Sequence, residues 1–160
     1  MDEVGYQIRT LQEARDLAHA LAEAHPDPDR VVIGLTELLV NAVEHGNLGI
    51  TYEEKADLLE RGAFDAEIER RLALPELAAR RVRVTLRRDP EGIVTRIEDE
   101  GEGFDWHPYL DREPDSDRAL DNNGHGIAIA RGMSFDDLSY DGRGNVVVAL
   151  VRIPPSESQG

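Results

Sequence analysis

The segment Glu37-Leu-Leu-Val-Asn41-Ala-Val-Glu-His45-Gly46 closes a long run of apolar residues at helical spacing. Residues four apart lie on nearly the same face of a helix, so we expect Glu37 and Asn41 to point together. Carboxylate and amide oxygens suit Mg²⁺, which keeps waters and substrate phosphates as its other ligands. By itself the pattern is equally typical of an amphipathic helix with solvated polar residues. The apolar stripe expected to pack into the core comprises Val31, Leu35, Leu38, Leu39, Ala42 and Val43.

Composition restricts the classes of partner. The chain has 160 residues, a formal net charge of −15 and no cysteine. The length suits one domain with a sizeable core, and the acidic charge argues against duplex nucleic acid or an anionic membrane as a partner. The absence of cysteine excludes disulfides and thiolate metal sites. No window approaches the roughly 20 apolar residues of a membrane span, and no signal-peptide pattern is present, so we expect a soluble, cytoplasmic protein.

The residues before the central segment predict a strand and a helix. Residues 6–10 are typical of a short edge strand, and residues 11–24 carry apolar side chains at helical spacing. A Pro-containing break follows, in which Asp27 and Pro28 are candidates for the N-cap and first residue of the central helix. We expect that helix to end with Gly46 as its C-terminal cap and with His45 as a cation beside the negative end of the helix dipole.

A helical insert is predicted at about residues 51–76. Thr51 and Glu54 have the spacing of a capping box that opens one helix, and a second short helix would bury Phe64, Ile68 and Leu72 and end at residues 74–75. The outer side of the insert is rich in charged residues. This pattern indicates a solvated helical hairpin that takes no part in a site, although it is a candidate for a partner or dimer contact.

Two strands precede an aspartate and a run of glycines. Residues 82–87 and 93–97 alternate apolar and polar side chains around the turn 89–92, which predicts a hairpin. Asp99 follows the second strand, with Gly101 and Gly103 at alternate positions after it. An aspartate at a strand end, next to a backbone that a ligand can approach closely, is a candidate for ligand recognition.

The last third of the chain predicts a loop, a phosphate-binding turn and a hairpin. Residues 105–121 have the length of a functional lid. The turn Gly124-His125-Gly126 leads directly into a helical apolar run, so its free amides and the helix dipole suit phosphate groups. Residues 135–140 and 145–153 predict a final hairpin, and the nearly continuous apolar run in its second strand is typical of a central strand.

Taken together, these motifs resemble those of a known superfamily. In their order, spacing and predicted elements they are similar, over residues 6–153, to the N, G1, G2 and terminal boxes of the GHKL (gyrase/chaperone/histidine-kinase/mismatch-repair) ATPases. Within that superfamily the central segment and the short lid look most like the RsbW-type anti-sigma-factor serine/threonine kinases. The four motifs are Glu37-x-x-x-Asn41, Asp99-x-Gly101-x-Gly103-Phe104, Gly124-x-Gly126-Ile127 and Gly142-x-Gly144-Asn145-Val146.

The resemblance implies a two-layer α/β sandwich, the Bergerat ATP-binding fold. Its sheet would be mixed but mainly antiparallel, with helices covering one face and a short ATP lid. Residues 1–153 would form one histidine kinase-like ATPase domain, and residues 154–160 are expected to be a disordered tail.

The resemblance also implies roles for individual residues. Glu37 would be the general base and Asn41 the Mg²⁺ ligand, while Asp99 would accept a hydrogen bond from the adenine amino group. Asn145 stands where many relatives carry a threonine that holds adenine through water. The other residues implied to contact ATP are Gly101 and Gly103 of the G1 box and Gly124, His125 and Gly126 of the G2 box.

Three functions are compatible with this assignment. The first is ATP-dependent serine/threonine phosphorylation of a small antagonist protein, with a sigma factor as the other partner and a homodimer as a possible assembly. The second is a switch that binds ATP and sequesters a partner without transferring phosphate; the acidic lid, with Asp111, Glu113, Asp115, Asp117 and Asp121, leaves closure over a triphosphate open. The third is the detached ATPase domain of a two-component histidine kinase system. Direct nucleic-acid or membrane binding is not expected.

Overall fold

A five-stranded sheet forms one layer of the fold. The computed structural model describes residues 2–102, 134–141 and 144–153, so the predictions for the lid, for the turn 124–126 and for the tail lie outside the described residues. All four strand pairings in this part of the chain are antiparallel. The spatial order is β1 (Asp2–Ile8), β2 (Val82–Asp89), β3 (Gly92–Glu98), β5 (Val146–Arg152) and β4 (Asp137–Asp141).

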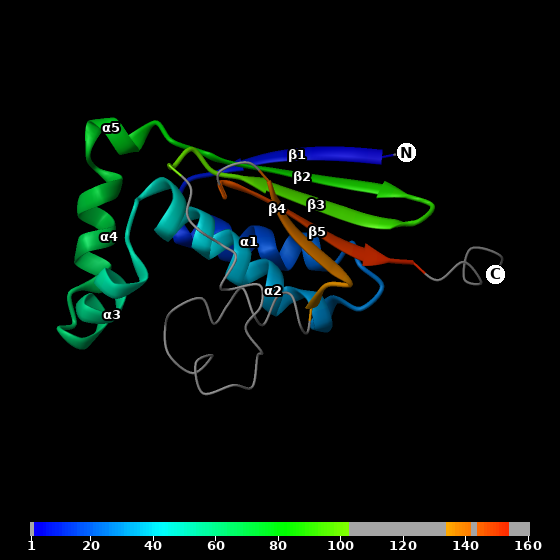
Figure 1. Ribbon diagram of the computed structural model, residues 1–160, viewed down its shortest axis with the longest axis horizontal. Helices are drawn as coiled ribbons and strands as arrows, with labels where there is room; N and C mark the ends of the chain where they lie inside the picture. Colours follow the sequence, from blue (N-terminus) through cyan, green and yellow to red (C-terminus); the bar gives the residue numbers. More distant parts are fainter. Residues whose placement is uncertain (1, 103–133, 142–143, 154–160) are drawn as a thin grey trace.

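Helices α1 and α2 form the second layer and cover one face of this sheet (Figure 1). Helix α1 spans Leu11–Ala22 and α2 spans Pro28–Asn41. All six residues of the predicted apolar stripe are buried, among them Leu35, Leu39 and Val43 with no exposed surface. They pack against the inward-facing side chains of the sheet, so the two-layer α/β sandwich predicted from the sequence is confirmed.

The predicted helix starts are confirmed by their capping contacts. Asp27 accepts a hydrogen bond from the backbone of Arg30, and Pro28 is the first residue of α2. Thr51 and Glu54 form the predicted capping box at the start of α3. Each cap satisfies a backbone N–H that has no partner within the helix, so these ends are set by local sequence.

The end of the central helix differs from the prediction. The chain continues past Asn41 as a π-helix, η1 (Ala42–Asn47), so Gly46 is not a C-terminal cap and does not have a positive φ angle. The backbone N–H of Leu48 donates to the carbonyl of Val43, five residues earlier. π-Helical turns are rare and often occur at functional sites, so this segment is a place to look for one.

The helical insert stands at one end of the sheet, beyond the last turn of the central helix (Figure 1). Of the predicted α4 face, Ile68 is buried, and Phe64 and Leu72 are partly buried against the core. Among the described residues, no helix has the length and apolar character needed to cross a bilayer. The insert comprises α3 (Tyr52–Glu60), α4 (Phe64–Leu72) and a short additional helix, α5 (Pro75–Ala78).

The packing of α2 predicts a measurable effect at Gly34. A Cβ atom there would lie 2.4 Å from Cβ of Ser134, whose hydroxyl also accepts from the Gly34 N–H. We expect Gly34→Ala to lower the free energy of unfolding by about 1–3 kcal/mol, because a well-packed core must shift to admit the methyl group. This corresponds to about 2–4 °C per kcal/mol in thermal melting. In the matched control Gly5→Ala, where the added methyl would have no neighbour within 4 Å, melting should not fall; equal losses in both variants would contradict the packing argument.

Candidate functional site

A pocket lies between the central helix and the sheet, where the helix ends. Three of the residues predicted to bind ATP, Asn41, Asp99 and Asn145, line it together. Glu37 and Gly101 are described but are not among the lining residues, and Gly103, Gly124, His125 and Gly126 lie outside the described part of the chain. The remaining lining residues are Leu38, Ala42, His45, Gly46, Tyr52, Ile97, Tyr140, Gly144 and Val147.

Two glycines allow the π-helix to touch the loop after β3. A Cβ atom on Gly46 would lie 2.4 Å from Cγ of Asp99, and one on Gly101 would lie 2.2 Å from the carbonyl oxygen of Gly46. Neither distance is compatible with a side chain, so the absence of one at both positions permits this approach. Sequence reasoning assigned Gly46 to a helix cap and missed this role, which only the tertiary contact reveals.

Hydrogen bonds fix the Asp99 loop in place. Oδ1 of Asp99 accepts from the N–H of Gly101 at 2.8 Å, and the N–H of Asp99 donates to the carbonyl of Asn145 at 2.9 Å. The side-chain amide of Asn145 donates back to the Asp99 carbonyl at 3.2 Å. Asn47 of η1 accepts from the N–H of Glu100 at 2.7 Å. The aspartate is therefore held by β5 on one side and by the π-helix on the other.

Asn41 presents an amide whose hydrogen-bonding capacity is not used within the described structure. Its Nδ2 atom is buried and has no hydrogen-bond partner among the described residues. The two orientations of an amide have nearly the same shape, so either its oxygen or its nitrogen can face a ligand. The described residues contain no cluster of three acidic, histidine or cysteine side chains. A single amide fits Mg²⁺, which is commonly held by one or two protein oxygens together with substrate phosphates.

Glu44 and Lys55 form a buried ion pair next to the pocket. Nζ of Lys55 lies 2.7 Å from Oε1 of Glu44, whose side chain is only 2% exposed. Burial raises the pKa of Glu44; Lys55 opposes this, and the charge of Glu37 adds to it. Removing either partner would leave an uncompensated charge in the interior, so the pair ties the insert to the π-helix.

His45 is a neutral, buried residue and not the helix-capping cation that the sequence predicts. Burial lowers its pKa to about 4. Its Nδ1 atom contacts the carbonyl oxygen of Ile50, and its ring lies against that of Tyr52, with centroids 3.9 Å apart. The helix continues past this residue, so no helix end is present for a cation to stabilise.

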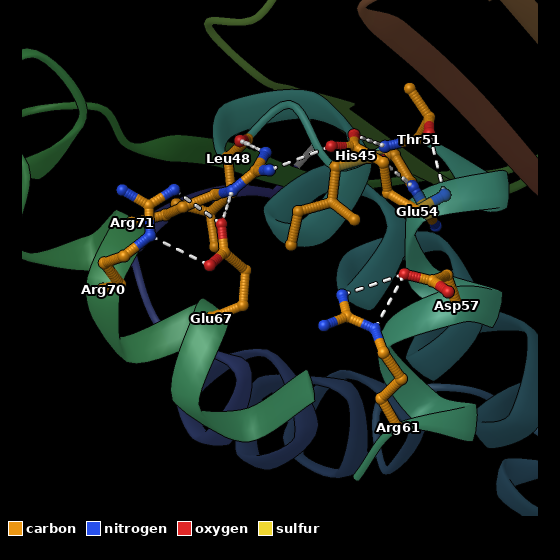
Figure 2. Close-up of polar contacts among 10 residues, drawn as sticks. His45, Leu48, Thr51, Glu54, Asp57, Arg61, Glu67, Arg70 and Arg71 are labelled. Carbon is orange, nitrogen blue, oxygen red and sulfur yellow. Dashed lines mark hydrogen bonds and ion pairs between the residues drawn. The ribbon is translucent and has the colours of Figure 1, made fainter. Parts of the chain in front are cut away.

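The helical insert is part of the site, which corrects the expectation of a purely solvated hairpin. Its first residue, Tyr52, lines the pocket. Figure 2 shows Arg71 reaching from α4 to the carbonyl oxygen of Leu48, 3.0 Å away, and to the carboxylates of Glu54 and Glu67. Arg80 donates to the carbonyl oxygen of Asn47 at 2.9 Å. Both arginines therefore bind the chain that leaves the π-helix, which fixes the insert against the pocket.

The state of His45 predicts a pH dependence of stability. The unfolded chain, with an ordinary histidine pKa of 6.5, binds a proton that the folded protein excludes down to about pH 4. The free energy of unfolding should therefore fall as pH decreases through this interval, by about 2 kcal/mol between pH 7 and pH 5 from this residue. Denaturant titrations of His45→Gln should show a shallower loss than the wild type.

Other groups are separated from this effect by comparison of variants. Burial lowers the pKa of His25, which acts in the same direction, and raises that of Glu44, which acts oppositely. Both are retained in His45→Gln, so their contributions cancel in the difference. Replacing the exposed His19 by glutamine is the control. Parallel curves for His45→Gln and the wild type would contradict a neutral, buried His45.

Comparison with known proteins identifies the family. Residues 6–151 match the family model described as histidine kinase-like ATPase domain. Comparison with curated proteins gives no match. The matched range contains the central helix, the helical insert, the Asp99 loop and the final hairpin, and so every residue that lines the pocket. The chain therefore belongs to the family of histidine kinase-like ATPase domains, within the GHKL-type superfamily.

Proposed function

We propose that this protein binds Mg-ATP and transfers the γ-phosphate to a serine or threonine hydroxyl of a partner protein, in the manner of an anti-sigma-factor kinase. The observation that supports the proposal is the meeting of Asn41, Asp99 and Asn145 in one pocket. These residues come from three separate motifs of the sequence. Membership in the ATPase family supports the nucleotide as the ligand. The proposed partners are a small antagonist protein and a sigma factor.

Asp99 selects adenine in this proposal. A carboxylate only accepts hydrogen bonds, so it pairs with the amino group of adenine and is repelled by the carbonyl oxygen that guanine carries at the same position. Gly101 and Asn145 hold the carboxylate and its backbone. The amide nitrogen of Asn145 is bonded to the Asp99 carbonyl, so a contact from this residue to the nucleotide would use its amide oxygen.

Asn41 holds the magnesium ion in this proposal, together with the phosphates of ATP. When bound, the ion neutralises charge on the phosphate oxygens. The phosphate-binding turn 124–126 lies outside the described residues and remains a prediction. Phosphoryl transfer depends mainly on positioning and charge neutralisation, so a metal, backbone amides and one base are sufficient for it.

Glu37 acts as the general base in the proposed reaction. It lies one helical turn before Asn41 and is partly exposed, so a hydroxyl of a docked partner can reach it. Glu37 takes the proton of the attacking hydroxyl, whose oxygen forms a bond to the γ-phosphorus. The bond between that phosphorus and the β–γ bridging oxygen breaks, and ADP leaves with the bond's electron pair.

The adenine assignment predicts the behaviour of Asp99→Asn. The new amide retains an oxygen that can accept from Gly101, but it also presents an N–H₂ donor toward the adenine amine. Affinity for ATP and ADP should fall at least about tenfold, because a charge-assisted hydrogen bond is lost. Calorimetric titration with ATP, GTP and ADP, with and without Mg²⁺, measures this effect. Asp65→Asn on the exposed start of α4 is the control. Unchanged ATP affinity in Asp99→Asn would remove Asp99 from the adenine-binding role.

The base assignment predicts a separation of binding from chemistry in Glu37→Gln. The substitution keeps the shape of the side chain but removes the proton acceptor, so ATP affinity should stay within about twofold while transfer falls by about 10²–10⁴-fold. Transfer of radiolabelled γ-phosphate to candidate antagonist proteins measures the second quantity. Glu60→Gln on the exposed face of α3 is the matched control. Phosphorylation by Glu37→Gln at the wild-type rate would refute the role. ATP binding by the wild type without transfer to any partner would instead favour the non-catalytic switch.

A further inference from the structure

We propose that Tyr52, the first residue of the helical insert, forms a wall of the base subsite and contributes to the choice of adenine over guanine. This inference rests on the proposed ATP-binding function and adds a selectivity residue to it. Tyr52 lines the same pocket as Asp99 and Asn41, although it belongs to the insert and not to the motifs that carry the resemblance.

The start of α3 fixes the position of Tyr52. Thr51 accepts from the backbone N–H of Glu54 at 3.0 Å, and the Glu54 side chain accepts from the N–H of Thr51 at 2.9 Å. This reciprocal capping box sets the backbone of the first turn, in which Tyr52 is the first helical residue. The direction of its ring toward the pocket therefore follows from a rigid helix start.

The ring of Tyr52 rests on a neutral aromatic surface. Its centroid lies 3.9 Å from that of His45, with an angle of 34° between the planes. His45 is itself held by the carbonyl oxygen of Ile50. Two flat rings at the end of the π-helix thus form one continuous side of the pocket, and flat apolar surfaces of this kind favour a planar base.

The polar end of Tyr52 lies close to the acceptor that recognises the base. Burial raises the pKa of Tyr140, and the nearby Tyr52 and Asp99 contribute to the increase. All three side chains line the pocket, so their oxygen atoms converge on the same region. A tyrosine hydroxyl can donate a hydrogen bond, whereas an ionised aspartate only accepts one.

This combination complements the edge of adenine. Adenine presents an amine donor beside the N1 acceptor, so a carboxylate and a hydroxyl donor match it. Guanine presents a carbonyl acceptor beside an N1–H donor, which reverses the order. Tyr52 and Asp99 together therefore discriminate in the same direction.

The insert holds this wall rigidly. Lys55, one turn after Tyr52, is paired with the buried Glu44 of the π-helix at 2.7 Å. Arg71 binds the carbonyl oxygen of Leu48 in the connection between η1 and α3. Because both ends of the connection are tied down, the tyrosine does not have to be ordered when a nucleotide binds, which favours affinity.

Nucleotide titrations of Tyr52→Phe and Tyr52→Ala test the inference. Phenylalanine keeps the contact with His45 and removes only the hydroxyl, so ATP affinity should fall about two- to tenfold with GTP affinity unchanged. Alanine also removes the ring, and ATP affinity should fall at least about tenfold, the value of a base–aromatic contact. The control is Arg61→Ala on the same helix, which breaks only an exposed ion pair with Asp57.

The outcomes separate this inference from the function on which it rests. Wild-type protein that binds no adenine nucleotide would refute the proposed function itself. ATP binding by the wild type, with the same ATP and GTP affinities in Tyr52→Phe, would overturn the role of Tyr52 alone. Thermal melting checks that each variant folds. Should Tyr52→Ala fail that check, the conservative Tyr52→Phe decides the question.

Discussion

The pocket depends on a contact between two stretches of backbone that are far apart in the sequence. Gly46 of the π-helix and Gly101 of the loop after β3 approach so closely that neither position admits a Cβ atom. The contact places Asp99 against the end of the helix that carries Asn41. A side chain at either glycine would separate the helix from the sheet at the point where their polar groups must meet. The ligand-binding residues are thus brought together by the lack of two side chains.

Much of the fold is predictable because its signals are local. The buried stripe of α2, the capping box at Thr51 and the N-cap at Asp27 each depend on residues within one or two turns. The π-helix was not predictable in this way. Its hydrogen bonds span five residues instead of four, and that choice follows from what the segment packs against. The predicted cap at Gly46 failed for this reason.

The site was predictable to the extent that single motifs carry it. Asn41, Asp99 and Asn145 were identified from their neighbours in sequence, and the fold places them in one pocket. Tyr52 and Lys55 were missed because their importance comes from partners in η1, His45 and Glu44, and a charged helical insert resembles any solvated surface. Glu44 illustrates the difficulty: an acidic residue in a polar stretch of sequence is buried here because a lysine from another helix neutralises it.

The π-helix also restricts how this chain can tolerate changes in length. Each residue of an α-helix turns the chain by about 100°. Deleting one residue from the six-residue segment Ala42–Asn47 would restore the ordinary winding and rotate everything beyond the deletion around the axis. His45 and Gly46 would then leave the sheet-facing side, and the insert would swing away from the pocket. The segment therefore acts as a phase setting between the helix and all that follows it, so its length matters as much as its composition.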